Sequence, residues 1–201
     1  MKHSIRALRW LMLAAVFSVL GGCAAFYVDG HAPEVPVTQF RKPAQPTDVQ
    51  VIWEFQTNGA ANARATEMLK ARVQDQISGS GLFTKVSEAH TPRGGLLTLT
   101  VNNVPLDGDA AAKGFVAGLT FGLAGQTVGD GYTCTIRYSS PRAGTGALVK
   151  QGQHVIYTSI GTGGPPTGAQ KVASVDEAVT TMLRQLISRT LNDLSQDPAF
   201  P

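Results

Sequence analysis

The sequence has no surplus of one charge beyond its first residues. Lys2, Arg6 and Arg9 are the only charged residues among residues 1–22, and the rest of the chain carries 14 basic and 14 acidic residues. Electrostatic binding of nucleic acid needs a surplus of cations that face the phosphates. We therefore expect no nucleic-acid partner.

The sequence also lacks the residue sets that metal sites and catalytic sites need. His31, His90 and His154 stand far apart in the chain, without the spacing of metal ligands. Cys134 stands in an alternating strand pattern, which predicts a buried, inert thiol. No phosphate-binding loop and no serine-hydrolase motif is present. We therefore expect no metal, no cofactor and no enzymatic activity.

The apolar run near the N-terminus is short for a membrane span. Residues 1–9 contain the basic residues, and residues 10–20 are apolar except for Ser18. A transmembrane helix needs about 20 such residues, whereas a basic segment followed by a shorter apolar one is the plan of a secretory signal peptide. Continuing the count through residues 21–28 gives a longer, mostly apolar stretch. An uncleaved N-terminal membrane anchor is therefore the alternative.

The apolar run ends in Leu20, Gly21, Gly22 and Cys23. This motif resembles the lipobox of bacterial lipoproteins, in which an aliphatic residue stands three positions before the cysteine and small residues stand between. The resemblance implies that residues 1–22 are a signal peptide recognised through Leu20, Gly21 and Gly22, and that Cys23 becomes the acylated first residue. Acyl chains would anchor the protein because each buried methylene contributes about 0.8 kcal/mol. Ala24 stands where an Asp tends to retain enterobacterial lipoproteins at the inner membrane, so we expect the periplasmic face of the outer membrane.

Residues 23–47 have no helical or strand periodicity over most of their length. Pro33, Pro36, Pro43 and Pro46 stand among polar residues. Such a segment favours extended polyproline geometry, which predicts a tether between the lipidated cysteine and a periplasmic domain of residues 48–201. A loop packed along the domain surface is the alternative for part of this length.

The domain shows patterns of both strands and helices. Alternation and apolar runs predict strands at residues 49–56, 82–88, 96–104, about 132–138 and 154–160. Helical spacing predicts one helix from Asn58 or Gly59 to about Ser78. A second helix is expected behind Ser174, which forms a capping box with Glu177. The order of these elements predicts an α+β fold: a mixed sheet of about five strands covered on one face by two amphipathic helices.

One part of this pattern is similar to a known type of periplasmic domain. The strand VQVIWEF, an Ala-rich amphipathic helix, and Gly81-Leu82-Phe83 leading to Val86 cover roughly residues 48–104. This order resembles the α/β domain of the curli-secretion lipoprotein, the penicillin-binding-protein activator lipoproteins and the N-terminal part of the Tol-system propeller protein. The resemblance concerns the fold pattern, and it carries no functional residue to this chain.

An uncharged, Gly-rich apolar segment lies within an insert at residues 110–129. Gly114, Gly118 and Gly122 repeat every four residues, a spacing that lets two helix backbones approach closely in lipid. These glycines are candidate interface residues. The alternative is a buried Gly-rich segment of the core, since glycine costs about 1 kcal/mol at a helical position without a packing reason.

These observations lead to one expectation about function and to two alternatives. We expect a lipid-anchored, non-enzymatic lipoprotein of the cell envelope that binds or scaffolds another envelope protein or itself. The first alternative is a subunit of an oligomeric, secretion-related or pore-related assembly that uses residues 114–129. The second is a periplasmic domain on an uncleaved N-terminal anchor.

Overall fold

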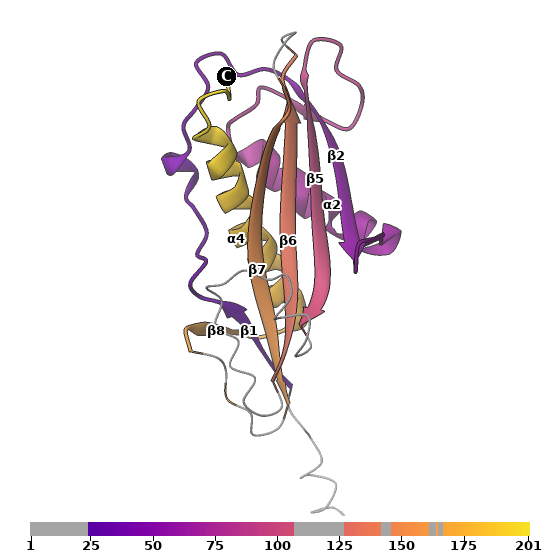
Figure 1. Ribbon diagram of the computed structural model, residues 1–201, viewed down its shortest axis with the longest axis vertical. Helices are drawn as coiled ribbons and strands as arrows, with labels where there is room; N and C mark the ends of the chain where they lie inside the picture. The colour runs from indigo at the N-terminus through magenta and orange to yellow at the C-terminus, as the bar shows by residue number, and fades with distance from the viewer. Residues whose placement is uncertain (1–23, 107–126, 142–145, 161–163, 165–166) are drawn as a thin grey trace, which may run out of the picture.

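A computed structural model of the chain describes residues 24–106, 127–141, 146–160, 164 and 167–201. Eight strands form one sheet, and the helices α2 and α4 lie behind it on one face (Figure 1). Strands β1 to β8 span Ala24–Asp29, Val49–Thr57, Ala60–Ala61, Val86–Ser87, Gly95–Leu106, Thr127–Ser139, Leu148–Ile160 and Ala169–Val172. The helices are the 3-10 turn η1 (Val37–Gln39), α2 (Ala63–Gly79) and α4 (Val175–Ser195). The predicted α+β class is confirmed.

The sheet is mixed, with the order β3-β2-β5-β6-β7-β1-β8 and with β4 paired to one end of β2. β2 runs parallel to β5 and β4, and all other pairs are antiparallel. Five of the strands correspond to predicted ones, although β4 is shorter and β7 is longer than expected. The sheet has more strands than expected because β1, β3 and β8 were not predicted. Residues 127–129, which we had assigned to the Gly-rich insert, belong to β6.

The core lies between the sheet and the two helices. Cys134 and Ile136 of β6 face this core and are fully buried beside Leu97 and Leu99 of β5. The apolar stripe of α4 closes the other side, with Met182, Leu183, Leu186, Ile187 and Leu191 all buried. The stripe therefore packs on its own sheet, which is the commonest use of an amphipathic helix face.

The starts of the two long helices have local sequence causes. The Ser174 hydroxyl accepts a hydrogen bond from the Glu177 N–H at 3.1 Å, and the Glu177 carboxylate accepts one from the Ala173 N–H at 2.7 Å. The predicted cap by Ser174 is thus confirmed, whereas the Glu177 carboxylate accepts from the residue before Ser174 and not, as a capping box requires, from Ser174 itself. The predicted start of α2 at Asn58 or Gly59 is wrong.

The residues Asn58 and Gly59 form the turn between β2 and β3. Both have positive φ, 51° and 78°, which suits the two-residue turn of a hairpin. The helix begins after Asn62, whose side chain accepts a hydrogen bond from the Ala65 N–H at 3.0 Å.

The N-terminal segment lies against the domain. Residues 24–29 form β1, which pairs with β7 on one side and with β8 on the other, and Val28 is fully buried. Farther on, the Val35 N–H donates to the Ser188 hydroxyl of α4 at 3.0 Å, and Phe40 is buried in the core. The expected extended tether is therefore wrong for residues 24–41: a strand comes first, and the predicted alternative, a loop packed along the domain, follows it, because Val28 and Phe40 are buried in the core.

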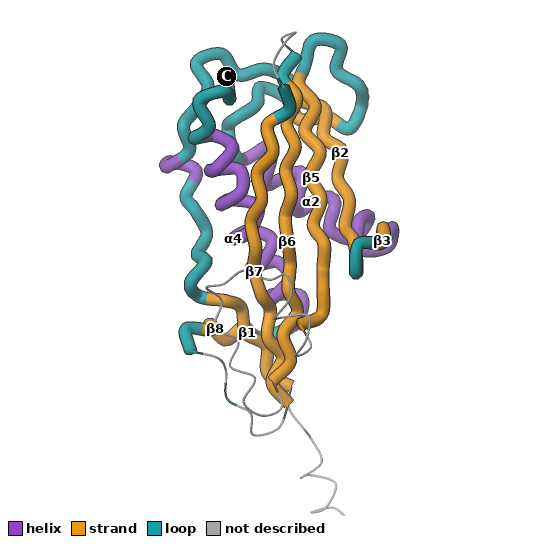
Figure 2. Tube along the Cα trace, viewed as in Figure 1, coloured by secondary structure: helices purple, strands orange, loops and turns teal. Residues whose placement is uncertain are grey.

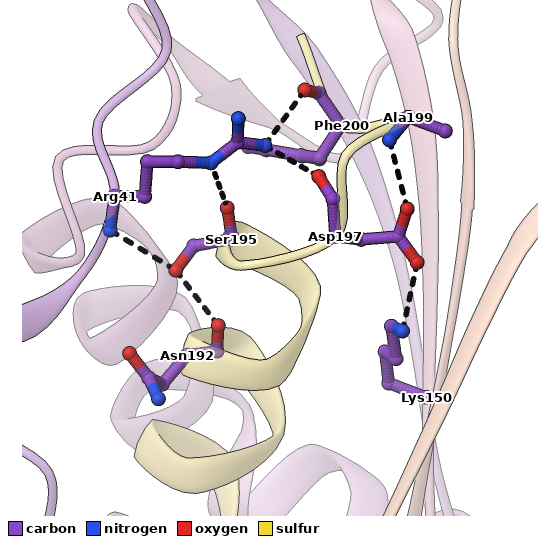
Figure 3. A network of polar contacts seen from close by, with 7 residues as sticks. All are labelled: Arg41, Lys150, Asn192, Ser195, Asp197, Ala199 and Phe200. Carbon is purple, nitrogen blue, oxygen red and sulfur yellow. Dashed lines mark hydrogen bonds and ion pairs between the residues drawn. The ribbon is translucent and has the colours of Figure 1, made fainter.

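Arg41 fixes the end of this segment to the C-terminus (Figure 3). Its guanidinium group donates to the carbonyl oxygens of Ser195 at 2.7 Å, Phe200 at 3.0 Å and Asp197. The Asp197 carboxylate also pairs with Lys150 of β7 at 2.8 Å, which lowers the pKa of Asp197. The segment that precedes β2 and the residues at the end of α4 and after it are thus held together by charge-assisted hydrogen bonds.

Candidate functional site

The residues that the sequence singled out lie outside the described residues. They are Leu20, Gly21, Gly22 and Cys23 of the lipobox and Gly114, Gly118 and Gly122 of the insert. Their roles in signal recognition, acylation and close packing stay predictions. The structure does place the residues that flank them.

One end of the sheet brings these flanking residues together. Ala24 pairs with Ile160 and Thr127 pairs with Ser159, while Leu106 lies one strand away beside β6. We call this the Ala24 end of the sheet; it is the lower end in Figure 2, where β1 and β8 lie. Ala24, which follows the lipobox, therefore lies at the same end of the domain as Leu106 and Thr127, which flank residues 107–126.

A groove of about 240 Å³ lies at the outer edge of β2, beside α2. We call it the β2 groove. β2 contributes Val51, Ile52 and Trp53, α2 contributes Thr66, Glu67, Lys70 and Gln74, and Glu88 follows β4. The α2 residues are spaced at three and four positions, so they form one stripe of the helix that faces the strand edge.

Polar contacts close both ends of the β2 groove. At one end, Lys70 and Gln74 reach from α2 to the Glu88 carboxylate, and the Lys70 contact is an ion pair of 2.8 Å. This contact raises the pKa of Lys70 and lowers that of Glu88. At the other end the Thr66 hydroxyl accepts a hydrogen bond from the Phe55 N–H at 2.9 Å. Between these contacts the groove is open.

His154 of β7 is the most buried histidine among the described residues. Its Nε2 lies 2.6 Å from the Gln185 Oε1 of α4, and its Nδ1 lies 3.1 Å from the Val155 carbonyl oxygen. Burial lowers its pKa, and the contact with Gln185 acts in the opposite direction with a smaller effect. His154 therefore lies neutral between sheet and helix and does not reach solvent.

His31, His90 and Cys134 do not form a common site with His154. His31 lies in a different contact, with Nδ1 3.0 Å from the Asp29 carboxylate, and His90 is exposed. Cys134 is fully buried, as predicted, and burial raises the pKa of its thiol to about 12, which disfavours the reactive thiolate. Within the described ranges, no three metal-ligating side chains come together, and no helix is long and apolar enough to span a membrane.

The β2 groove was not predicted, although one residue carries a signal for it. In β2 the apolar side chains Val49, Val51 and Phe55 face the core, and the alternation makes the intervening positions polar. Ile52 breaks this pattern, since it is apolar on the outward face and 48% exposed. The pairing that leaves this edge open depends on residues far away in the sequence.

Comparisons with known proteins find structures that are similar at low sequence identity and low TM-score. No protein-family model and no curated protein sequence matches it. It is similar to the structure of a protein assigned as a neuraminyllactose-binding hemagglutinin homologue from Helicobacter pylori, with 10% identity over 82% of this chain and 92% of that chain and a TM-score of 0.42. It is also similar to a PelC dodecamer from Paraburkholderia phytofirmans, with 9% identity over 85% of this chain and 98% of that chain and a TM-score of 0.32.

A third similar structure is a minor lipoprotein from Acinetobacter baumannii. The identity is 12% over 74% of this chain and 86% of that chain, and the TM-score is 0.27. At TM-scores this low, the similarities carry no argument about the function of the chain.

Proposed function

We propose that the chain is a lipoprotein anchored to the periplasmic face of the bacterial outer membrane, where its domain binds or scaffolds another envelope protein without catalysing a reaction. The lipobox Leu20-Gly21-Gly22-Cys23 supplies the anchor. In this proposal the Gly-rich insert is not required for anchoring, and the acyl chains hold the protein at the membrane.

The position of Ala24 in the sheet defines how the anchored domain would lie on the membrane. Ala24 is the first residue of β1 and pairs with Ile160, so no free linker separates Cys23 from the sheet. An acylated Cys23 would therefore hold the Ala24 end of the sheet within a few ångströms of the headgroups, because one residue spans at most about 3.6 Å. The long axis of the sheet then points away from the bilayer.

The anchoring is tested by mass and by location. We expect the intact mature protein to lack residues 1–22 and to carry the mass of acyl chains on Cys23. A Cys23→Ala variant should appear as a soluble periplasmic form or as an unprocessed precursor. Wild-type protein that retains residues 1–22 and carries no lipid would contradict the proposal and would support the uncleaved anchor.

A second candidate function is favoured by the position of Leu106 and Thr127. Both lie at the Ala24 end of the sheet, so residues 107–126 begin and end where the anchor would meet the bilayer. This position favours a use of residues 114–126 in membrane contact or in assembly with a neighbour.

A Gly118→Leu substitution tests this second function. If Gly114, Gly118 and Gly122 pack against a neighbour or lipid, the leucine should block close approach and lower oligomerisation or membrane retention in a Cys23→Ala background. The thermal midpoint should stay unchanged in that case. A lowered midpoint with no change in oligomeric state would instead assign the segment to the core.

A further inference from the structure

We propose that the β2 groove binds an extended, basic segment of another polypeptide, which adds a short strand to the open edge of β2. The inference rests on the proposed binding function and gives the chemistry of its partner. The backbone of β2, the space along its edge and the charges on α2 support this binding mode.

The backbone of Trp53 favours a polypeptide ligand. In a strand, the N–H and C=O groups of alternate residues face the same edge. On this edge the Val49 N–H donates to the Lys85 carbonyl at 2.8 Å, and the Phe55 N–H donates to the Thr66 hydroxyl at 2.9 Å. Trp53 faces the same edge, where no described strand pairs with it. Its N–H and C=O are a template for an added strand.

The space along the edge favours a short, flexible segment. β4 pairs with β2 only at Val49 and Gln50, and β3 pairs with it only at Gln56 and Thr57. An added strand therefore has room beside residues 51–55. A second copy of the chain does not fit, because its own β2 carries β3 and β4 in the same plane. The groove volume of about 240 Å³ is also below the roughly 300–1,000 Å³ of small-molecule pockets.

The charges around the groove favour a basic segment. Glu67 lines the groove from α2, is exposed and forms no ion pair within the described part of the chain. The positive charge of Lys70 is already matched by Glu88 at 2.8 Å. Ile52 is exposed on the outward face of the same edge. A strand that alternates basic and apolar residues would place cations toward Glu67 and apolar side chains beside Ile52.

The fluorescence of Trp53 provides a direct test. A Trp10→Phe change leaves Trp53 as the only tryptophan of the full chain. The probe is an acetylated seven-residue peptide of alternating Lys and Val, titrated to about 1 mM against the purified protein in a neutral detergent. We expect a saturable change in Trp53 emission and slower hydrogen exchange of the Trp53 amide. The same peptide with proline at its centre should bind about tenfold more weakly, because proline removes a ladder donor.

Charge variants on α2 separate groove binding from general attraction. Glu67→Arg should weaken binding of the Lys/Val peptide about fivefold, as expected for a surface charge contact. Asp75→Arg, exposed on the same helix outside the groove, is the matched control and should leave the affinity unchanged. A Glu/Val peptide should bind the Glu67→Arg variant more tightly than it binds the wild type.

Three results would overturn the proposal: no peptide changes Trp53 emission, the proline peptide binds as tightly as its parent, or Glu67→Arg binds the Lys/Val peptide like the wild type. Each of these results is independent of the mass of the mature protein. If no peptide binds the groove but Cys23 is acylated, only the groove proposal is wrong. If a peptide binds but the protein carries no lipid, only the anchoring proposal is wrong.

Discussion

Acid should weaken the domain through His154. The ring is fully buried between β7 and α4, and burial lowers its pKa below the usual value of 6.5. The Gln185 and Asp29 oxygens oppose this shift, and Arg189 adds to it, but burial is the largest effect. The folded protein therefore holds His154 neutral at a pH where the unfolded chain already binds a proton.

The sign and size of the effect follow from proton linkage. Above about pH 6.5 neither state protonates His154, so it contributes no pH dependence. As the pH falls from about 6.5 toward the lowered pKa of the folded state, the unfolded chain takes up the proton first. The free energy of unfolding should then fall by about 1.4 kcal/mol for each pH unit. Below the folded-state pKa the loss levels off.

Urea denaturation between about pH 7.5 and about pH 5 measures this dependence. We compare the Cys23→Ala chain with the same chain carrying His154→Gln, a neutral side chain at every pH. The variant should be less stable by a constant amount and should lack the slope below about pH 6.5. His90→Gln, at an exposed histidine, should keep the slope. Equal slopes in the wild type and in His154→Gln would refute the reasoning.

Other predictions concern packing, capping and the C-terminal network. Leu186→Ala, in the buried stripe of α4, should lower the free energy of unfolding by about 2–5 kcal/mol. Ser174→Ala should lower it by about 1 kcal/mol, because the helix cap is lost. Thermal or urea denaturation measures both changes. If the Leu186→Ala protein is as stable as the wild type, the stripe does not form the core and is better explained as an interface with a partner. Gly152→Ala would place a Cβ 2.6 Å from the Thr190 hydroxyl, so it should cost about 1–3 kcal/mol, and Thr190→Ala in the same chain should recover most of that loss. No recovery in the double variant would show that this contact is not the cause. Arg41→Lys keeps the positive charge but loses the planar guanidinium group, which donates to three carbonyl oxygens. Hydrogen exchange of the amides in residues 195–200 should therefore accelerate. Unchanged exchange would show that a single ammonium donor is sufficient.

The elements that the sequence predicted well are those with a strong local period. The terminal helix has eleven buried positions, and β2 alternates along its length except at Ile52. The hairpin turn at Asn58 and Gly59 was misread as a helix start, although Asn-Gly is a strong hairpin signal, because β3 has only two residues and adds no period of its own.

The elements that the sequence missed depend on distant partners. β1 has only six residues, and its strand conformation is stabilised by pairing with β7 and β8 near the other end of the chain. The β2 groove likewise exists because β3 and β4 cover only the two ends of one edge. The pairing of β1 with β7 and β8 and the pairing of β4 with β2 join residues far apart in the sequence, so local periodicity cannot reveal them.

The pairing of β1 also sets an order for the folding of the chain. β1 is made first, yet its neighbours β7 and β8 are made among the last elements, so it has no partner while the rest of the domain is being synthesised. Contacts of such large sequence separation form late because a long loop must first close. Until β7 arrives, Phe26 and Val28 have no surface to cover them. The sheet can therefore grow from β2, β5 and β6 outward, and the strand nearest to Cys23 completes it only after nearly the whole chain is available.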